Sequence, residues 1–185
     1  MIRINAGVRR GLQLQTLAGT DIIRPTTDKI RQAIFNILLH NDWGMDLQNA
    51  TILDAFAGTG AWGLEAISRG ASRAVFMEHN AEAATILRNN IARCKFEGVT
   101  TVIQGNSLQP PTAQHAADII FLDPPYGLNM ASQAVSALDQ AGWINKESLI
   151  IIEMKVKQPE LLVVGFQEAA NRTYGNTAIA FWHKT

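Results

Sequence analysis

Four consecutive residues have the chemistry to hold an amino group in place: Asp123, Pro124, Pro125 and Tyr126. They follow an apolar run at 119–122. Because proline fixes φ and has no N–H, the carbonyls before and between two prolines can be held outward and unpaired. The Asp123 carboxylate and the Pro124 carbonyl could then accept both hydrogens of an exocyclic amino group on a nucleobase, while Tyr126 stacks on the base. The pattern predicts a site where that nitrogen faces an electrophile. A proline-stiffened turn after a buried strand is the alternative.

A glycine-rich loop lies where open α/β sheets bind nucleotides. Gly58 and Gly60 follow an apolar run at 51–56, and glycines permit a tight turn close to a ligand. No Gly-Lys-Ser/Thr follows, which excludes a P-loop. Asp54 before the loop would crowd a pyrophosphate but suits a ligand with a positive charge. Glu78 ends the next apolar run, where a carboxylate can accept both hydroxyls of a ribose. The alternative for the glycine loop is a turn with only a structural role, and the alternative for Glu78 is an ordinary surface glutamate.

Alternating strands and helices must position these residues. We expect strands at 51–56, 74–78, 100–104, 118–123, 148–154 and 176–182. We expect helices at 28–39, 61–69, 81–94 and 130–140, the first of them capped by Thr26 or Thr27. Such βαβ units form a parallel sheet with helices on both faces. The segment 155–174 has little helical pattern, so we expect one of the last two strands to run antiparallel.

Composition indicates a folded globular protein. The 185 residues are 47% hydrophobic and 17% charged, which supports a core and excludes disorder as the dominant state. Cys94 has no partner for an internal disulfide, and the cysteine and four histidines show no metal-ligand spacing. The sequence contains no apolar run of the ~18–20 residues that cross a bilayer and no secretory signal, so we expect a cytoplasmic protein. We expect one domain, with an α/β core at 24–185 and a small β appendage at 1–23.

Basic residues gather near the N-terminus although the formal net charge is zero. Six of the 16 basic residues lie within 1–31, against two of the 16 acidic ones, Asp21 and Asp28. A basic arm of this kind favours a polyanion as partner, although an ordinary solvated surface is the alternative. The residues we expect to contact an RNA backbone are Arg3, Arg9, Arg10, Arg24 and Arg31.

The motif at 123–126 and the run Asp-Ala-Phe-Ala-Gly-Thr-Gly at 54–60 resemble the amino-group methyltransferases that depend on S-adenosylmethionine. The resemblance extends to the bacterial 16S ribosomal RNA (guanine-N2) methyltransferase family usually called RsmD. It covers nearly the whole chain, through segments at 3–7, 10–12, 24–36, 53–70 and 174–177. It implies a class I (Rossmann-like) methyltransferase fold, with a mainly parallel seven-stranded sheet whose final strand is inserted antiparallel.

The resemblance also implies the residues of the cofactor site. Where the family usually has an acidic residue near the third strand, this chain has Asn106, whose amide can still bond the adenine edge. By this resemblance, the residues expected to bind S-adenosylmethionine are Asp54, Phe56, Gly58, Thr59, Gly60, Glu78, Asn106 and Ser107. The implied substrate is 16S rRNA, within a small ribosomal subunit or an assembly intermediate, and we expect a monomer.

The expected reaction is methyl transfer to the N2 amino group of a guanine. The sulfonium methyl is already electrophilic, so the protein has only to hold nitrogen, carbon and sulfur in line. One alternative is an N6-adenine methyltransferase acting on DNA, because adenine also has an exocyclic amine. The chain has no second segment large enough for a DNA-recognition domain, which argues against it. A catalytically silent nucleoside- or RNA-binding module is the other alternative, and intact Asp123 and Tyr126 argue against that one.

Overall fold

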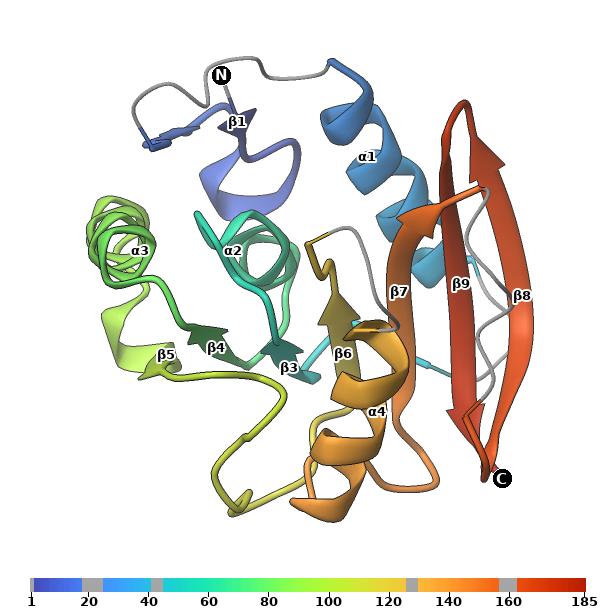
Figure 1. Ribbon diagram of the computed structural model, residues 1–185. Coiled ribbons are helices and arrows are strands. Elements are labelled where there is room, and N and C mark those ends of the chain that lie inside the picture. Colours follow the sequence, from blue (N-terminus) through green and yellow to red (C-terminus); the bar gives the residue numbers. More distant parts are fainter. Residues whose placement is uncertain (1, 18–24, 41–44, 126–129, 157–162) are drawn as a thin grey trace.

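A mainly parallel sheet is the framework of the protein (Figure 1). The computed structural model describes residues 2–17, 25–40, 45–125, 130–156 and 163–185. Within them a seven-stranded sheet has the order β5-β4-β3-β6-β7-β9-β8. Its strands are β3 (Thr51–Asp54), β4 (Arg73–Glu78), β5 (Thr100–Gln104), β6 (Ile119–Leu122), β7 (Leu149–Lys155), β8 (Phe166–Tyr174) and β9 (Thr177–Lys184). Strands β3 to β7 run parallel to one another, whereas β9 runs antiparallel to both β7 and β8.

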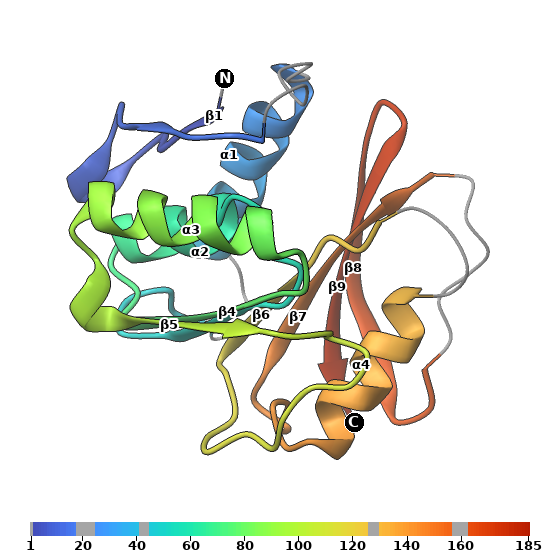
Figure 2. The ribbon, with the colours of Figure 1, turned by 60° about the vertical axis from the view of Figure 1, so that its left-hand side comes forward.

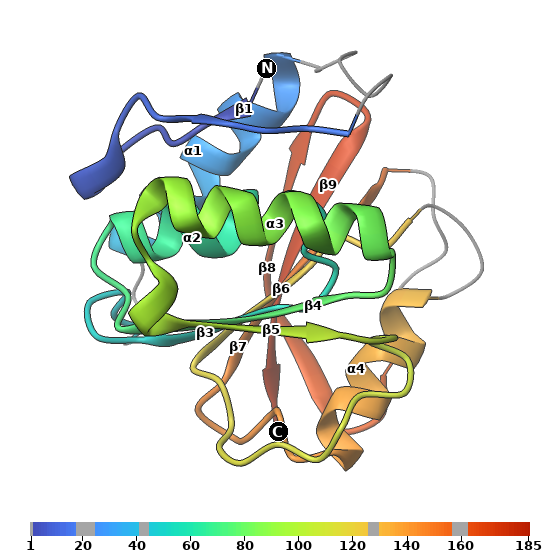
Figure 3. The ribbon, with the colours of Figure 1, turned by 90° about the vertical axis from the view of Figure 1, so that its left-hand side faces the viewer.

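Helices cover both faces of this sheet. They are α1 (Pro25–Leu39), α2 (Ala61–Ser68), α3 (Ala81–Cys94) and α4 (Met130–Gln140). Figures 2 and 3 show α2 and α3 on one side of the sheet and α4 on the other. Alternate strand residues fill the two cores: Phe121 packs with Ile34 of α1 and Leu64 of α2, and Ile120 packs with Leu138 of α4. No helix in the described residues is long and apolar enough to span a membrane.

The expected α/β fold is confirmed, including the antiparallel insertion of the final strand between β7 and β8. The predicted start of the first helix is wrong, because α1 already begins at Pro25. Proline is favoured as the first helical residue, since its missing N–H would be unpaired there in any case. Thr26 and Thr27 therefore lie within the helix and not at the position before it, where a cap was predicted. Strand β8 was not predicted, because most of its side chains are exposed at the sheet edge and give no apolar alternation.

The N-terminal segment forms a separate small sheet, as expected. Strand β1 (Ile2–Arg3) pairs antiparallel with β2 (Gln13–Leu14), and a 3₁₀ turn, η1 (Gly7–Arg9), lies between them. Gly7 has φ +77°, and a Cβ there would lie 1.6 Å from the carbonyl oxygen of Ser68 in α2. Only glycine allows this close approach. The N-terminal segment (residues 2–17) thus packs against α2, beside α3 (Figure 3).

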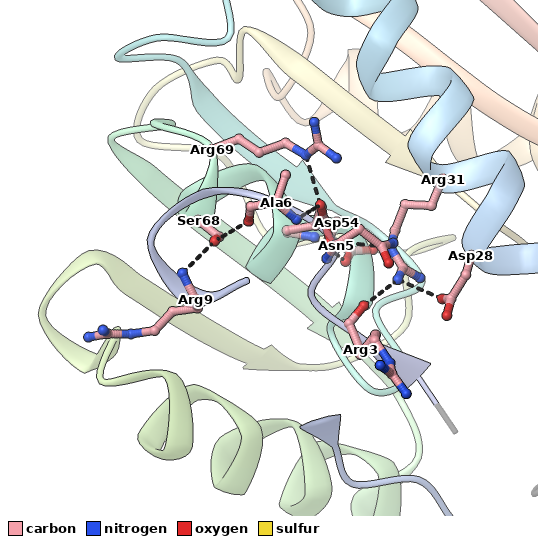
Figure 4. A network of polar contacts seen from close by, with 11 residues as sticks. Arg3, Asn5, Ala6, Arg9, Asp28, Arg31, Asp54, Ser68 and Arg69 are labelled. Atoms are coloured by element: carbon pink, nitrogen blue, oxygen red, sulfur yellow. Dashed lines mark hydrogen bonds and ion pairs between the residues drawn. The ribbon is translucent and has the colours of Figure 1, made fainter. Parts of the chain in front are cut away.

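A buried polar network holds this segment in place (Figure 4). The Glu65 carboxylate, 0% exposed, accepts hydrogen bonds from the backbone N–H groups of Asn5 and Ala6 at 2.7 and 3.0 Å. It also pairs with Arg69 at 2.8 Å and lies 3.7 Å from Nε of Arg31. A buried carboxylate is stable only when paired and hydrogen-bonded, and these partners fulfil that condition.

Candidate active site

Each of four neighbouring strands ends in, or carries near its carboxyl end, an acidic residue. Glu78 is the last residue of β4, Asp54 is the last of β3, and Asp123 directly follows β6. Leu122 is the register partner of Ile152, so Asp123 and Glu153 occupy the next neighbouring positions of β6 and β7. The sheet order β4-β3-β6-β7 therefore places the four carboxyl groups side by side along one edge. Ligands of open α/β sheets bind at this carboxyl edge.

The surroundings of Asp54, Asp123 and Glu153 favour the protonated forms of these three acids. Asp54 is 1% exposed, and its pKa is raised to about 7 by desolvation, with Asp123 and Glu78 adding repulsion. Asp123 is exposed at the end of β6, and desolvation by the surrounding chain raises its pKa to about 6. Desolvation and the charge of Asp123 raise the pKa of Glu153 to about 8. A cationic ligand bound at this edge would favour the ionised forms and relieve the repulsion between them, so the edge is complementary to such a ligand.

Backbone N–H groups orient the two acids beside the glycine loop. Gly63 N–H in α2 donates to Asp54 at 3.1 Å. Glu78 accepts from Gly58 N–H and from Asn80 N–H, both at 2.8 Å. Glu78 is therefore not a surface glutamate. Its carboxylate is hydrogen-bonded to the loop that follows β3. Both carboxylates are thus bonded to the backbone of this loop or of the helix that follows it, with acceptor capacity left on their oxygens.

The loop itself is held by glycine geometry and by a buried amide. Gly60 has φ +82°, and a Cβ there would lie 2.4 Å from a methyl carbon of Leu87. Asn90 in α3 donates to the carbonyl oxygen of Thr59 at 2.9 Å and exchanges two hydrogen bonds with the backbone of Gln15. One side chain thus joins the predicted cofactor loop to the N-terminal segment. Asn90 was not predicted, because the pairing links residues far apart in sequence.

The other predicted cofactor residues have different surroundings. Phe56 is half-buried after β3. Asn106 is exposed, and its side-chain oxygen accepts from Leu108 N–H at 2.9 Å. Ser107 is 3% exposed, and its hydroxyl donates to the carbonyl oxygen of Ala55. The Ser107 side chain therefore joins the segment after β5 to the end of β3.

The predicted amino-group site lies at the end of β6. Pro124 is buried, whereas Asp123 and Pro125 are exposed. Tyr126 lies outside the described residues. The Trp62 ring in α2, which was not predicted, stacks on Phe121 two residues before Asp123, with ring centroids 5.0 Å apart. This stack fixes the strand end from which Asp123 projects.

The arginines predicted to contact RNA fall into two groups. Arg3 and Arg10 are exposed on the N-terminal segment. Arg9 is half-buried, donates to the carbonyl oxygen of Cys94 at 2.5 Å and lies over the Phe96 ring. Arg31 is 3% exposed and bonds Asp28 and the carbonyl oxygen of Arg3, both at 2.7 Å (Figure 4). The prediction that Arg31 contacts RNA is wrong, because its guanidinium is buried in the network. Arg24 lies outside the described residues.

Comparisons with known proteins agree with this architecture. A family model described as conserved hypothetical protein 95 matches residues 2–183. The chain is 34% identical over 162 residues to ribosomal RNA small subunit methyltransferase D of Haemophilus influenzae, covering 85% of this chain and 81% of that relative. It is also 34% identical over 157 residues to the Escherichia coli K12 protein of the same name, covering 84% of this chain and 76% of that one.

Solved structures share the fold. The Escherichia coli protein yhhF superposes with a TM-score of 0.85 at 31% identity, over 99% of this chain and 97% of that one. The magnesium protoporphyrin IX methyltransferase of Synechocystis, solved with bound SAM, superposes with a TM-score of 0.68 over 94% of this chain and 87% of that one. At 14% identity this second likeness shows the fold alone. The fold is that of the class I methyltransferases.

Proposed function

Because the chain belongs to the conserved hypothetical protein 95 family, the family of the RsmD methyltransferases, we propose that it transfers a methyl group from S-adenosylmethionine to N2 of a guanine in small-subunit ribosomal RNA. The observation that supports this most strongly is the position of Asp123-Pro124 at the end of β6, next to Asp54 at the end of β3. That arrangement supports an amino-group acceptor at Asp123 beside a site suited to a cation at Asp54.

The residues present fit S-adenosylmethionine. This cofactor has an ammonium group, a sulfonium centre and a ribose with two free hydroxyls. Asp54 supplies negative charge for the cationic portion, and Glu78 has oxygen lone pairs for the ribose hydroxyls. Gly58 and Gly60 have positive φ values that let the backbone approach the ligand closely. When bound, the cofactor supplies an electrophilic methyl group.

The protein's own part in the reaction is to hold and orient the base. Asp123 and the Pro124 carbonyl accept the two N2 hydrogens, which leaves the nitrogen directed at the methyl group. Positioning of this kind is worth ~7–11 kcal/mol of the barrier. As positive charge develops on nitrogen, the Asp123 carboxylate stabilises it, and solvent then takes the proton. No strong base is needed, because the leaving thioether is neutral.

The N-terminal segment is the proposed contact for the RNA backbone. Arg3 and Arg10 are exposed there, so both can pair with phosphates. The whole chain has a formal net charge of zero, and we therefore expect modest affinity for RNA in general. Recognition then depends on the shape of the folded RNA around the flipped-out guanine. A monomer acting on a small ribosomal subunit or an assembly intermediate agrees with this proposal.

Methyl transfer with isotope-labelled S-adenosylmethionine tests the proposal. The acceptors are small ribosomal subunits from cells lacking the protein, the bare RNA of those subunits, and DNA. After digestion to nucleosides, the label is expected in N2-methylguanosine from the subunits or their RNA. Label in N6-methyladenine from DNA would establish the alternative substrate. Absence of label from all three acceptors would leave only a binding role.

A further inference from the structure

Glu153 is a carboxyl group in the middle of an otherwise apolar strand segment. It is the only charged residue within 149–154 of β7, and it is half-buried. Its register partner on β9 is Ile179, between Ala178 and Ala180. No described residue forms a hydrogen bond or ion pair with its side chain. Neither the resemblance nor the proposed mechanism gives it a role.

Among the described residues no cation forms an ion pair with the Glu153 carboxyl, and Lys155, two positions further along β7, is exposed. On the β6 side its neighbour is Asp123, another acid. The β9 positions opposite it are apolar. On α1, which packs on the same face, Arg31 is already bound to Asp28 and close to Glu65. Burial beside a second acid raises the pKa of Glu153 to about 8, so at neutral pH this carboxyl keeps its proton and is a hydrogen-bond donor.

The order of the strands places Glu153 on the side of Asp123 that is away from the cofactor residues, where the substrate nucleobase is expected to lie. Asp54 and Glu78, the proposed cofactor residues, are on β3 and β4, to one side of β6. Glu153 is on β7, to the other side. A base whose amino group is held at Asp123 and directed at a methyl group near β3 extends away from the cofactor. Its remaining edge therefore lies towards β7.

The edge of guanine matches this pair of side chains. It presents the N2 amino donor at one end and the O6 acceptor at the other, with N1–H between them. An ionised Asp123 accepts from the donors, and a protonated Glu153 donates to O6. Neighbouring strands lie ~4.8 Å apart, a spacing similar to that between N2 and O6. Adenine held by its amine presents a C–H at the far end of this edge and has nothing there to accept the Glu153 proton.

We propose that Glu153 is a specificity-determining residue that donates a hydrogen bond to O6 of the guanine whose N2 amino group is held by Asp123. This inference rests on the proposed function and deepens it. Sites built to hydrogen-bond a substrate group discriminate strongly against analogues that lack it, because their own polar group is then left unpaired.

The first test compares Glu153→Gln and Glu153→Ala with the wild type, as kcat/KM for small-subunit RNA between pH 6 and pH 9. The wild-type rate is expected to fall as the pH rises through about 8, where Glu153 loses its donor proton. Glu153→Gln keeps an N–H donor that does not titrate. The kcat/KM of this variant is therefore expected not to fall as the pH rises through about 8. Glu153→Ala is expected to lose roughly 10-fold or more relative to the wild type below pH 8, where the wild type still holds the donor proton, and to differ less from it at pH 9. The Kd of S-adenosylmethionine, measured by calorimetry, is expected to change less than threefold in both variants.

The second test replaces the methylated guanine, once mapped, by 2-aminopurine, which keeps the amine and lacks both O6 and the N1 proton. The wild type is expected to prefer guanine roughly 10-fold or more, and Glu153→Ala is expected to lose the part of that preference that O6 provides. The inference is overturned if Glu153→Gln shows the same alkaline decline as the wild type, or if Glu153→Ala keeps the full preference for guanine. Failure of the wild type to form N2-methylguanosine overturns the proposed function instead. The Gln variant keeps the inference testable should the Ala variant fail to fold.

Discussion

Single residues at the sheet edge determine what the site can bind. Asp54, Glu78 and Asp123 were predicted from motifs, because each follows a short apolar run in the sequence. Glu153 was not predicted as a site residue, since its place beside Asp123 depends on the pairing of β6 with β7. The only local signal for it is an acid inside an apolar strand. Only the folded structure shows, through burial and strand register, that this acid lies beside Asp123.

Cofactor affinity is expected to depend on pH through Asp54. Its pKa is raised to about 7, so the carboxyl is largely protonated at pH 6 and ionised at pH 8. Because the ionised form attracts a cationic ligand, the Kd of S-adenosylmethionine should fall as the pH rises across this range. Calorimetric titrations at pH 6, 7 and 8 measure it. Asp54→Asn should bind more weakly than the wild type at pH 8 and show a much flatter pH dependence. A Kd of the wild type that does not change with pH contradicts this role.

Elements far apart in the chain meet at the glycine loop. The boundaries of α3, α4 and β5 were predicted correctly from the local sequence. The edge strand β8 has no apolar alternation, and its place is fixed by pairing with β9. The docking of the N-terminal segment on α2 and α3 likewise depends on non-local contacts of Glu65, Ser68 and Asn90. Sequence patterns reveal elements but not these long-range contacts.

Removing the Asn90 amide is expected to weaken both the fold and cofactor binding. In Asn90→Ala the backbone groups of Gln15 and the carbonyl of Thr59 lose their partner. Loss of such buried bonds lowers the free energy of unfolding by about 1–3 kcal/mol. Urea unfolding measures the stability, and calorimetry measures the Kd of S-adenosylmethionine, which should rise.

Asn89→Ala is the matched control, because Asn89 is the exposed neighbour on the same helix. It should leave both quantities nearly unchanged. Equal effects of the two variants would show that Asn90 does not couple the N-terminal segment to the loop.

The whole molecule has a neutral formal charge with an uneven distribution. Basic residues gather in the N-terminal part, and acids gather along the carboxyl edge of the sheet. Three of these acids, Asp54, Asp123 and Glu153, have pKa values raised to about 7, 6 and 8. The native state therefore holds protons that the unfolded chain has already lost between about pH 4 and pH 8.

This charge arrangement predicts that the free protein becomes less stable as the pH rises. Where the native state binds more protons than the unfolded state, the free energy of unfolding falls with increasing pH. Urea unfolding of the cofactor-free protein at pH 5, 6, 7 and 8 should show this decline. Glu153→Gln removes one of the three groups and should reduce the slope between pH 5 and pH 8. An increase of wild-type stability over the same interval contradicts the raised pKa values.

The most direct test of the account is the separation of binding from turnover in Asp123→Ala. Single-turnover methyl transfer to the RNA is measured with the cofactor saturating, beside the Kd of S-adenosylmethionine from calorimetry. Because Asp123 is proposed to hold the amino group and not the cofactor, the rate should fall to background while the Kd stays within about threefold of the wild type. Normal turnover in this variant, or loss of cofactor binding with normal turnover per bound cofactor, would contradict the central claim.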